Sequence, residues 1–139
     1  MSCFVLDGVC VVDVCVTEGG GRVFNWVRGE WVEDEQWEHE REGLERVRGM
    51  CKRWGVRVDG EGYRDMVRGK GLEEGLIKEL SEVEGVRVTG NMGNVDIVPE
   101  TSGKDKAAEW VLGKIREEGR EVEWVGTAGD DDNDVELAR

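Results

Sequence analysis

The sequence predicts an α/β fold, because its apolar residues follow two different periods along the chain. Short runs rich in β-branched residues, at 10–17, 22–27, 86–89 and 95–98, have the composition of buried strands. Longer charged segments place apolar residues three, four and seven positions apart, which is the spacing of a helix with one buried face. At 139 residues the chain has room for one domain, or for one whole domain and part of a second.

The first half of the chain is predicted to form a hairpin and then a long helix. A glycine-rich turn at 18–21 joins the strands 10–17 and 22–27. The helix covers residues 33–54 and ends at Gly55. Its apolar stripe would consist of Trp37, Leu44, Val47, Cys51 and Trp54.

The middle of the chain is predicted to hold short strands at 56–58 and 63–67 and a helix at 72–80. A second hairpin follows. Its strands, 86–89 and 95–98, flank a turn rich in glycine and asparagine, the residues that best tolerate positive φ.

The last predicted helix begins at Ser102, whose side chain would cap it together with Asp105 three residues later. Gly119 ends this helix, and an apolar strand at 122–125 follows. The buried stripe of the helix would be Ala107, Ala108, Val111, Leu112 and Ile115.

Acidic residues dominate the charge of the chain, with 32 Asp and Glu against 19 Lys and Arg and a net charge of -13 at pH 7. Such a surface repels nucleic acid and anionic lipid, so neither nucleic acid nor membrane is expected as a partner. Asp7 and Asp13 interrupt the apolar N-terminal segment, which also lacks the basic residues of a signal peptide. The four cysteines show no C-x-x-C spacing, which is typical of free thiols in a reducing compartment, so a cytoplasmic location is expected.

A carboxylate-rich loop follows the last predicted strand. Gly129 leads into residues 130–134, which are four aspartates and one asparagine. In open α/β sheets ligands bind beyond the carboxyl ends of the strands, and carboxylates there can hold a hard cation. A helix-loop-helix calcium site is excluded because Val135 stands where glycine is required. A solvated acidic tail is the alternative.

Lys104 stands in the first turn of the last predicted helix, where a cation opposes the positive end of the helix dipole. A phosphate bound at this helix terminus would need a positive partner besides the helix N–H groups, so Lys104 is the candidate phosphate ligand. The alternative is a solvated surface lysine beside Lys106.

These two motifs resemble those of the haloacid dehalogenase-like phosphatases, in particular the sugar-phosphatase branch with an inserted α/β cap. Residues 129–134 look like the G-D-x-x-N-D metal motif of that family. The strand 95–99 and the following Ser102-Gly103-Lys104 look like its strand and lysine motif. Sucrose-phosphate phosphatases resemble the chain most closely, and trehalose-phosphate and mannosyl-phosphoglycerate phosphatases are the nearest alternatives.

The resemblance implies a partial, Rossmann-like core with an inserted α/β cap. Residues 1–25 would be a remnant of the core strands, 26–85 the cap and 86–139 the C-terminal part of the core. Residues 14–25 are similar to the strand and turn that lead into the cap.

The same resemblance implies hydrolysis of a sugar phosphate, or another small phosphate ester, through an aspartyl-phosphate with Mg²⁺. Asp130 would bind Mg²⁺ directly, Asp134 would bind it directly or through water, and Asn133 would orient these ligands. Lys104 would bind the phosphoryl group and steady the nucleophile. Asp105 replaces the glycine that usually follows this lysine, which adds a negative charge near the phosphate.

The chain departs from the family at the nucleophile. The family carries its nucleophilic aspartate in an N-terminal D-x-D-G motif, to which only Asp7-Gly8-Val9 is similar here. Val5 would occupy the nucleophile's place, and valine cannot form an aspartyl phosphate. The expectation is therefore an incomplete or inactive phosphatase, whose missing N-terminal half a second chain could supply.

Two other hypotheses stay open. The chain could be a non-catalytic module that recognises a carbohydrate or a protein through aromatic side chains, or a fragment with no function of its own. The aromatic residues in question are Trp26, Trp31, Trp37 and Tyr63, which could instead close the core of the cap.

Overall fold

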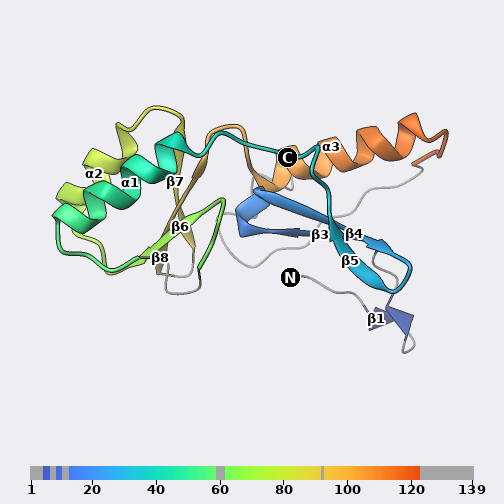
Figure 1. Ribbon diagram of the computed structural model, residues 1–139, viewed down its shortest axis with the longest axis horizontal. Helices are drawn as coiled ribbons and strands as arrows, with labels where there is room; N and C mark the ends of the chain where they lie inside the picture. Colours follow the sequence, from blue (N-terminus) through green and yellow to red (C-terminus); the bar gives the residue numbers. More distant parts are fainter. Residues whose placement is uncertain (1–4, 7–8, 11–12, 59–61, 92, 123–139) are drawn as a thin grey trace.

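The computed structural model describes residues 5–6, 9–10, 13–58, 62–91 and 93–122. Within these ranges the chain forms two antiparallel three-stranded sheets, a short two-stranded hairpin and three α-helices (Figure 1). The predicted α/β class is confirmed. The strands are β1 (Val5–Leu6), β2 (Val9–Cys10), β3 (Val14–Thr17), β4 (Arg22–Val27), β5 (Glu30–Glu33), β6 (Val67–Lys70), β7 (Val86–Asn91) and β8 (Asn94–Pro99). The helices are the 3-10 turn η1 (Glu18–Gly20), α1 (Glu42–Arg53), α2 (Glu74–Ser81) and α3 (Lys104–Glu117).

The two sheets lie at opposite ends of an elongated molecule (Figure 1). One sheet has the order β3-β4-β5 and lies beside α3; the other has the order β6-β8-β7 and is covered by α1 and α2. A fully buried apolar cluster fills the space between this second sheet and its two helices. It consists of Leu44, Val47, Cys51, Val67, Leu76, Leu80 and Ile97.

Several elements lie where strong local sequence patterns predicted them. The predicted strand 22–27 coincides with β4, and the predicted hairpin is formed by β7 and β8, with Asn91 opposite Asn94. The helix predicted at 72–80 is α2. Gly55 and Gly119 follow their helices with φ of 70° and 80°, the left-handed conformation that commonly ends a helix.

The helix predicted over 33–54 is wrong over residues 33–41. Residues 30–33 form strand β5, and the helix α1 begins only at Glu42. A two-residue turn joins β4 to β5, in which Arg28 and Gly29 both have positive φ, 50° and 86°. This is the backbone twist that suits a tight hairpin, so β5 pairs with β4 instead of continuing into the helix.

The other short elements are displaced from their predicted positions. The strand predicted at 63–67 lies at 67–70 instead, and the one predicted at 56–58 is reduced to a single bridge between Val58 and Gly69. In the segment 10–17 only 14–17 belong to β3. The predicted final strand lies outside the described residues except for Val122.

The start of α3 also differs from the prediction. Ser102 does not cap the helix: its hydroxyl donates to the carbonyl oxygen of Pro99 at 2.8 Å, and Gly103 is the residue that precedes the first turn. Of the five residues predicted to form the buried stripe, Ala107 is fully buried and the others are half-buried.

The predicted boundary between residues 85 and 86 remains a prediction, but strand pairing runs across it. Strands β7 and β8, from the segment 86–139, join β6, from the segment 26–85, in one sheet. Within the described ranges, no helix has the length and apolar character needed to cross a membrane.

Candidate functional site

The start of α3 is the place where the structure positions Lys104. Strand β8 ends at Pro99, whose carbonyl oxygen accepts hydrogen bonds from both the backbone N–H and the hydroxyl of Ser102, at 2.9 and 2.8 Å. Gly103 follows with φ of 154°, and Lys104 is the first residue of the helix. The chain therefore turns sharply from the sheet into α3, which fixes the helix N-terminus at the end of β8.

Two further contacts hold this turn in place. Arg87 on β7 donates from Nη2 to the carbonyl oxygen of Ser102 at 3.1 Å. On the other side, Gly20 of η1 lies directly against the backbone of Gly103: a Cβ on Gly20 would be 2.2 Å from the Gly103 carbonyl carbon and 2.6 Å from the Lys104 nitrogen. Only a residue without a side chain permits this approach, so the glycine-rich turn and the start of α3 form one unit.

The charges around this unit are mixed. Asp105 adds a carboxylate in the first turn of α3, and its Oδ1 is buried without a hydrogen-bond partner among the described residues. Lys106 donates from Nζ to the carbonyl oxygen of Glu100 at 2.6 Å, so this lysine is engaged at the surface. The helix N-terminus and Lys104 favour an anion, whereas Asp105 opposes one.

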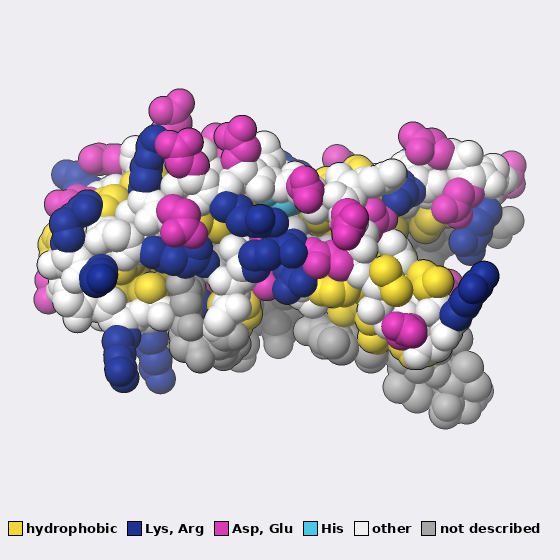
Figure 2. All heavy atoms as spheres, viewed as in Figure 1, with side chains coloured by type: hydrophobic (Ala, Val, Ile, Leu, Met, Phe, Trp, Pro, Cys, Tyr) yellow, Lys and Arg dark blue, Asp and Glu magenta, His cyan; other side chains and the backbone are white. Residues whose placement is uncertain are grey.

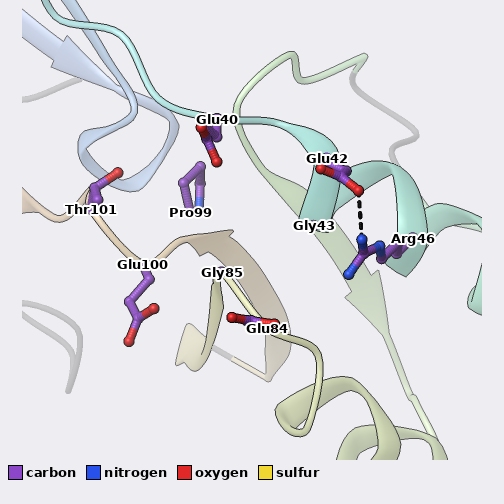
Figure 3. Close-up of a pocket in the computed structure, with 9 residues that line it drawn as sticks. All are labelled: Glu40, Glu42, Gly43, Arg46, Glu84, Gly85, Pro99, Glu100 and Thr101. Atoms are coloured by element: carbon purple, nitrogen blue, oxygen red, sulfur yellow. Dashed lines mark hydrogen bonds and ion pairs between the residues drawn. The ribbon is translucent and has the colours of Figure 1, made fainter.

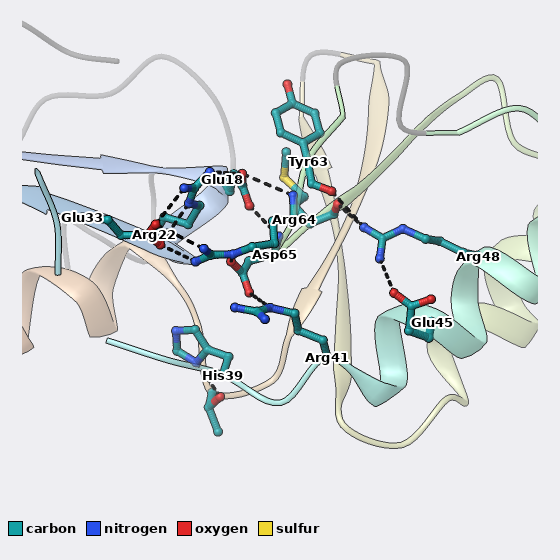
Figure 4. A network of polar contacts seen from close by, with 12 residues as sticks. Glu18, Arg22, Glu33, His39, Arg41, Glu45, Arg48, Tyr63, Arg64 and Asp65 are labelled. Atoms are coloured by element: carbon teal, nitrogen blue, oxygen red, sulfur yellow. Dashed lines mark hydrogen bonds and ion pairs between the residues drawn. The ribbon is translucent and has the colours of Figure 1, made fainter. Parts of the chain in front are cut away.

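A network of ion pairs connects the two sheets beside η1 (Figure 4). We call it the junction network. At its centre Asp65 accepts hydrogen bonds from Nε of Arg41 at 2.8 Å and from Nε of Arg64 at 2.6 Å. Glu18 of η1 accepts from the backbone N–H groups of Arg64 and Asp65, at 3.4 and 2.5 Å. The loop before β6 is therefore held against the turn that follows β3.

Glu33 on β5 completes the junction network. It accepts hydrogen bonds from Nε and Nη2 of Arg22 at 3.1 and 2.8 Å, and it is also paired with Arg64. The Arg22 hydrogen bond is the largest cause that lowers the pKa of Glu33 to about 2, against the opposing effect of burial, and Arg64 lowers it further. Glu33 therefore stays ionised at neutral pH, and the network keeps its charges.

A second set of polar contacts joins β5 to α3. Asp34 accepts hydrogen bonds from Nζ of Lys114 at 2.6 Å and from the side-chain amide of Asn25 at 3.0 Å. Burial alone would raise the pKa of Asp34, but these two bonds and that from the backbone N–H of Gln36 lower it. The indole Nε1 of Trp37 donates to the carbonyl oxygen of Gly20 at 2.8 Å. Trp37 thus lies on the connection between the sheets and not on the helix stripe where the sequence pattern put it.

His39 lies in the segment between β5 and α1 and contacts Thr101 in the segment between β8 and α3. Its Nδ1 is 2.7 Å from the hydroxyl oxygen of Thr101, and its ring is nearly perpendicular to that of Trp37, with the ring centroids 4.7 Å apart. Its Nε2 is buried without a hydrogen-bond partner within the described part of the chain. Burial is the largest cause that lowers the pKa of His39, and nearby Lys106 and Arg41 add to it, while Asp65 opposes it.

This environment predicts that acid destabilises the fold through His39. Because the pKa of His39 is lower in the folded state, the unfolded chain binds the proton more readily once the pH falls below about 6.5, the ordinary histidine value. Stability present above that pH is therefore lost as the pH falls further. In thermal unfolding between pH 7 and 5, the midpoint of the wild type should fall more steeply than that of His39→Gln. Parallel profiles would show that His39 does not titrate between the two states.

A groove of about 450 Å³ opens between α1 and the end of β8 (Figure 3). Four glutamates line it, and its arginine, Arg46, is already paired with Glu42 at 2.5 Å. Such a lining repels a phosphate ester, so this groove is not the anion site. The four glutamates are Glu40, Glu42, Glu84 and Glu100.

The predicted metal ligands Asp130, Asn133 and Asp134 lie outside the described residues, so their arrangement stays a prediction. Within the described part of the chain, no group of three or more His, Cys, Asp or Glu side chains could hold a metal ion. Val5 belongs to the backbone pairing of β1 with β2, and Asp7 lies outside the description. Of the sequence-predicted site residues, the structure thus places Lys104 alone.

The fold of this chain is similar to that of a solved structure. No protein-family model matches the sequence, and no curated protein matches it significantly. Among solved structures, the chain is similar to yhjK, a haloacid dehalogenase-like hydrolase protein from Bacillus subtilis, with a TM-score of 0.47 and 18% sequence identity. The match covers 90% of this chain and 47% of that one, so the chain spans about half the length of this hydrolase.

Proposed function

We propose that this chain is a sugar-phosphate phosphatase-like protein that binds a phosphate ester at the start of α3 and lacks the nucleophile needed to hydrolyse it alone. The observation that carries the proposal is the position of Lys104 as the first residue of a 14-residue helix. The residue in front of it is Gly103, whose backbone packs against Gly20 of η1, so the helix terminus is held in a fixed position.

The physical chemistry of this terminus supports an anionic ligand. The first N–H groups of a helix have no partner within the helix, and the helix dipole adds a partial positive charge there. A phosphoryl group would accept hydrogen bonds from these N–H groups and pair with the Lys104 ammonium. Asp105 lies beside them and repels a dianion, so we expect weaker binding than this geometry would otherwise give.

Mg²⁺ is the metal that the resemblance implies, and the donor set suits it. Asp130 and Asp134 offer carboxylate oxygens and Asn133 an amide oxygen, which are hard ligands of the kind that Mg²⁺ prefers. When bound, the ion would neutralise charge on the phosphoryl oxygens. We propose that Asp130 binds the ion directly, that Asp134 binds it directly or through water, and that Asn133 orients these ligands.

The nucleophile is the part that this sequence does not supply. Val5 stands where the resemblance implies an aspartate, and a valine side chain has no oxygen with which to attack phosphorus. A second chain that carries such an aspartate would complete the site. The substrate we propose is a sugar phosphate in the cytoplasm, with neither nucleic acid nor membrane as a partner.

Titration with inorganic phosphate tests the anion site directly. We expect Lys104→Ala to weaken phosphate binding about tenfold, because a hydrogen bond to a charged group contributes on the order of 1.5 kcal/mol or more. The matched control is Lys106→Ala, which removes a lysine two residues away that is engaged with the carbonyl oxygen of Glu100. Calorimetry or ³¹P NMR measures both. Equal losses in the two variants would show a general charge effect and not a site at Lys104.

A further inference from the structure

Exposed apolar side chains gather on the hairpin of β4 and β5. Within the described residues, four of the five large hydrophobic side chains that stay exposed belong to this hairpin, and the fifth is Trp54. In Figure 2 hydrophobic side chains are visible on the surface at the end of the molecule where this hairpin lies. The four are Trp26, Val27, Trp31 and Val32.

The two tryptophans form one recognisable unit, which we call the Trp pair. Trp26 and Trp31 are opposite each other in the strand register, and their ring centroids are 5.1 Å apart with the rings inclined at 66°. They are 48% and 36% exposed. Val27 and Val32 alternate with them along the strands and so belong to the other face of the sheet.

The remaining aromatic candidates are already engaged. The Trp37 indole donates to Gly20, and its ring lies 5.1 Å from that of Trp110. The Trp54 indole donates to a carboxylate oxygen of Glu79 at 3.2 Å. The ring of Tyr63 lies under the guanidinium of Arg68. Among the aromatic residues that the structure describes, the Trp pair is therefore the place where two exposed rings lie next to each other.

The next residues on the same face add polar groups. Phe24 and Glu33 are the cross-strand pair two positions along from the Trp pair, about 7 Å away, and Arg22 lies over the Phe24 ring. The Arg22 guanidinium and the Glu33 carboxylate are held together by two hydrogen bonds. A sugar ring has an apolar C–H face and hydroxyl groups at its rim. Exposed aromatic rings suit the face, and polar groups beside them suit the hydroxyl groups.

Size and charge narrow the choice of ligand. Taking about 250 Å² for a whole tryptophan side chain, the Trp pair exposes about 200 Å², so the two rings alone would supply about a quarter of the roughly 800 Å² per partner of a stable protein interface. A net charge of -13 disfavours nucleotides and other anions. Around the Trp pair, Arg28 and Glu30 carry opposite charges, as do Arg22 and Glu33. The charges of these four residues therefore cancel, which suits a neutral ligand.

We propose that the Trp pair binds the apolar face of a sugar ring in a neutral oligosaccharide. The rings would stack on the C–H face of the sugar, and the Arg22 guanidinium, which has N–H groups beyond those bonded to Glu33 and Glu18, would donate to its hydroxyl groups. This site lies on the hairpin and does not use Lys104, so it is independent of the proposed phosphate site.

Titration with cellohexaose and maltohexaose tests this site. We expect one of these sugars to bind, and we expect Trp26→Ala and Trp31→Ala each to weaken its binding about tenfold, since each removes one stacking ring. Trp54→Ala is the matched control, because it removes an equally exposed tryptophan outside the hairpin. Lys104→Ala should leave sugar binding unchanged, which separates this site from the phosphate site. Circular dichroism confirms that each variant folds.

Three outcomes would overturn the proposal. The first is a folded chain that binds neither sugar at millimolar concentration, and the second is binding that survives the loss of both tryptophans. The third is a doubling of mass in light scattering that Trp26→Ala and Trp31→Ala abolish, which would make the Trp pair a contact between copies of the chain.

Discussion

Adding a methyl group at Gly20 is expected to destabilise the fold by about 3 kcal/mol or more, the cost of forcing extra atoms into a closed backbone contact and of a strained conformation. The new Cβ would lie 2.2 Å from the carbonyl carbon and 2.3 Å from the oxygen of Gly103. These are backbone atoms, so no side-chain rotation relieves the clash. Gly20 also has φ of 99°, which L residues rarely adopt.

Gly29→Ala is the matched control for Gly20→Ala. Gly29 has a similar φ of 86°, but a Cβ there meets nothing within 4 Å. Its substitution therefore carries the backbone strain alone, about 1 kcal/mol. Thermal unfolding followed by circular dichroism should show a much larger fall in midpoint for Gly20→Ala. Equal falls would mean that η1 does not contact the start of α3.

Replacing Asp65 with alanine should have the second largest effect, a loss of about 2 to 3 kcal/mol in the free energy of unfolding. The Asp65 side chain is 1% exposed and bridges the guanidinium groups of Arg41 and Arg64. Removing it leaves two cations close together without their shared carboxylate. We place the effect below the roughly 3 to 5 kcal/mol of a fully buried pair because both arginines remain partly exposed to water.

The exposed pair of Glu42 and Arg46 is the control for Asp65→Ala. Both side chains are largely in water, so Glu42→Ala should change the free energy of unfolding by about 0.5 kcal/mol or less. Urea unfolding measures both variants. If the two changes have similar effects, the junction network does not hold the two sheets together.

The elements that could be predicted are those with a strong local signal. Strand β4 alternates its side chains, and the β7–β8 hairpin has glycine and asparagine in its turn. Strand β5 escaped prediction because Arg28-Gly29 is not a common hairpin turn and because the charges around 33–41 fit a helix as well as a loop. The helix cap at Ser102 failed because the helix begins one residue later than expected: Gly103 precedes its first turn, and the Ser102 hydroxyl donates to the Pro99 carbonyl.

In the candidate site too, the sequence predicted the local feature and missed the contacts between segments far apart in the chain. The sequence placed Lys104 in the first turn of a helix because the signal for the helix start near Ser102 and the apolar stripe after it are both local. The contact of Gly20 with Gly103 and the ion pairs of Glu33 and Asp65 join segments far apart in the chain. No local periodicity encodes such pairs. The glycine run that ends at Gly21 was the one sequence feature related to the contact of Gly20 with Gly103, but a glycine run does not indicate which segment packs against it.

The central claim is that the chain binds a sugar phosphate with Mg²⁺ but does not turn it over. Calorimetric titration with sucrose 6-phosphate, with and without Mg²⁺, tests this claim most directly, using the wild type, Lys104→Ala and Asp130→Asn. We predict binding that requires Mg²⁺, weakens in both variants and produces no sustained heat of hydrolysis. A folded chain that fails to bind the ester with Mg²⁺ would contradict the proposed site. Sustained hydrolysis that both substitutions abolish would contradict the missing nucleophile.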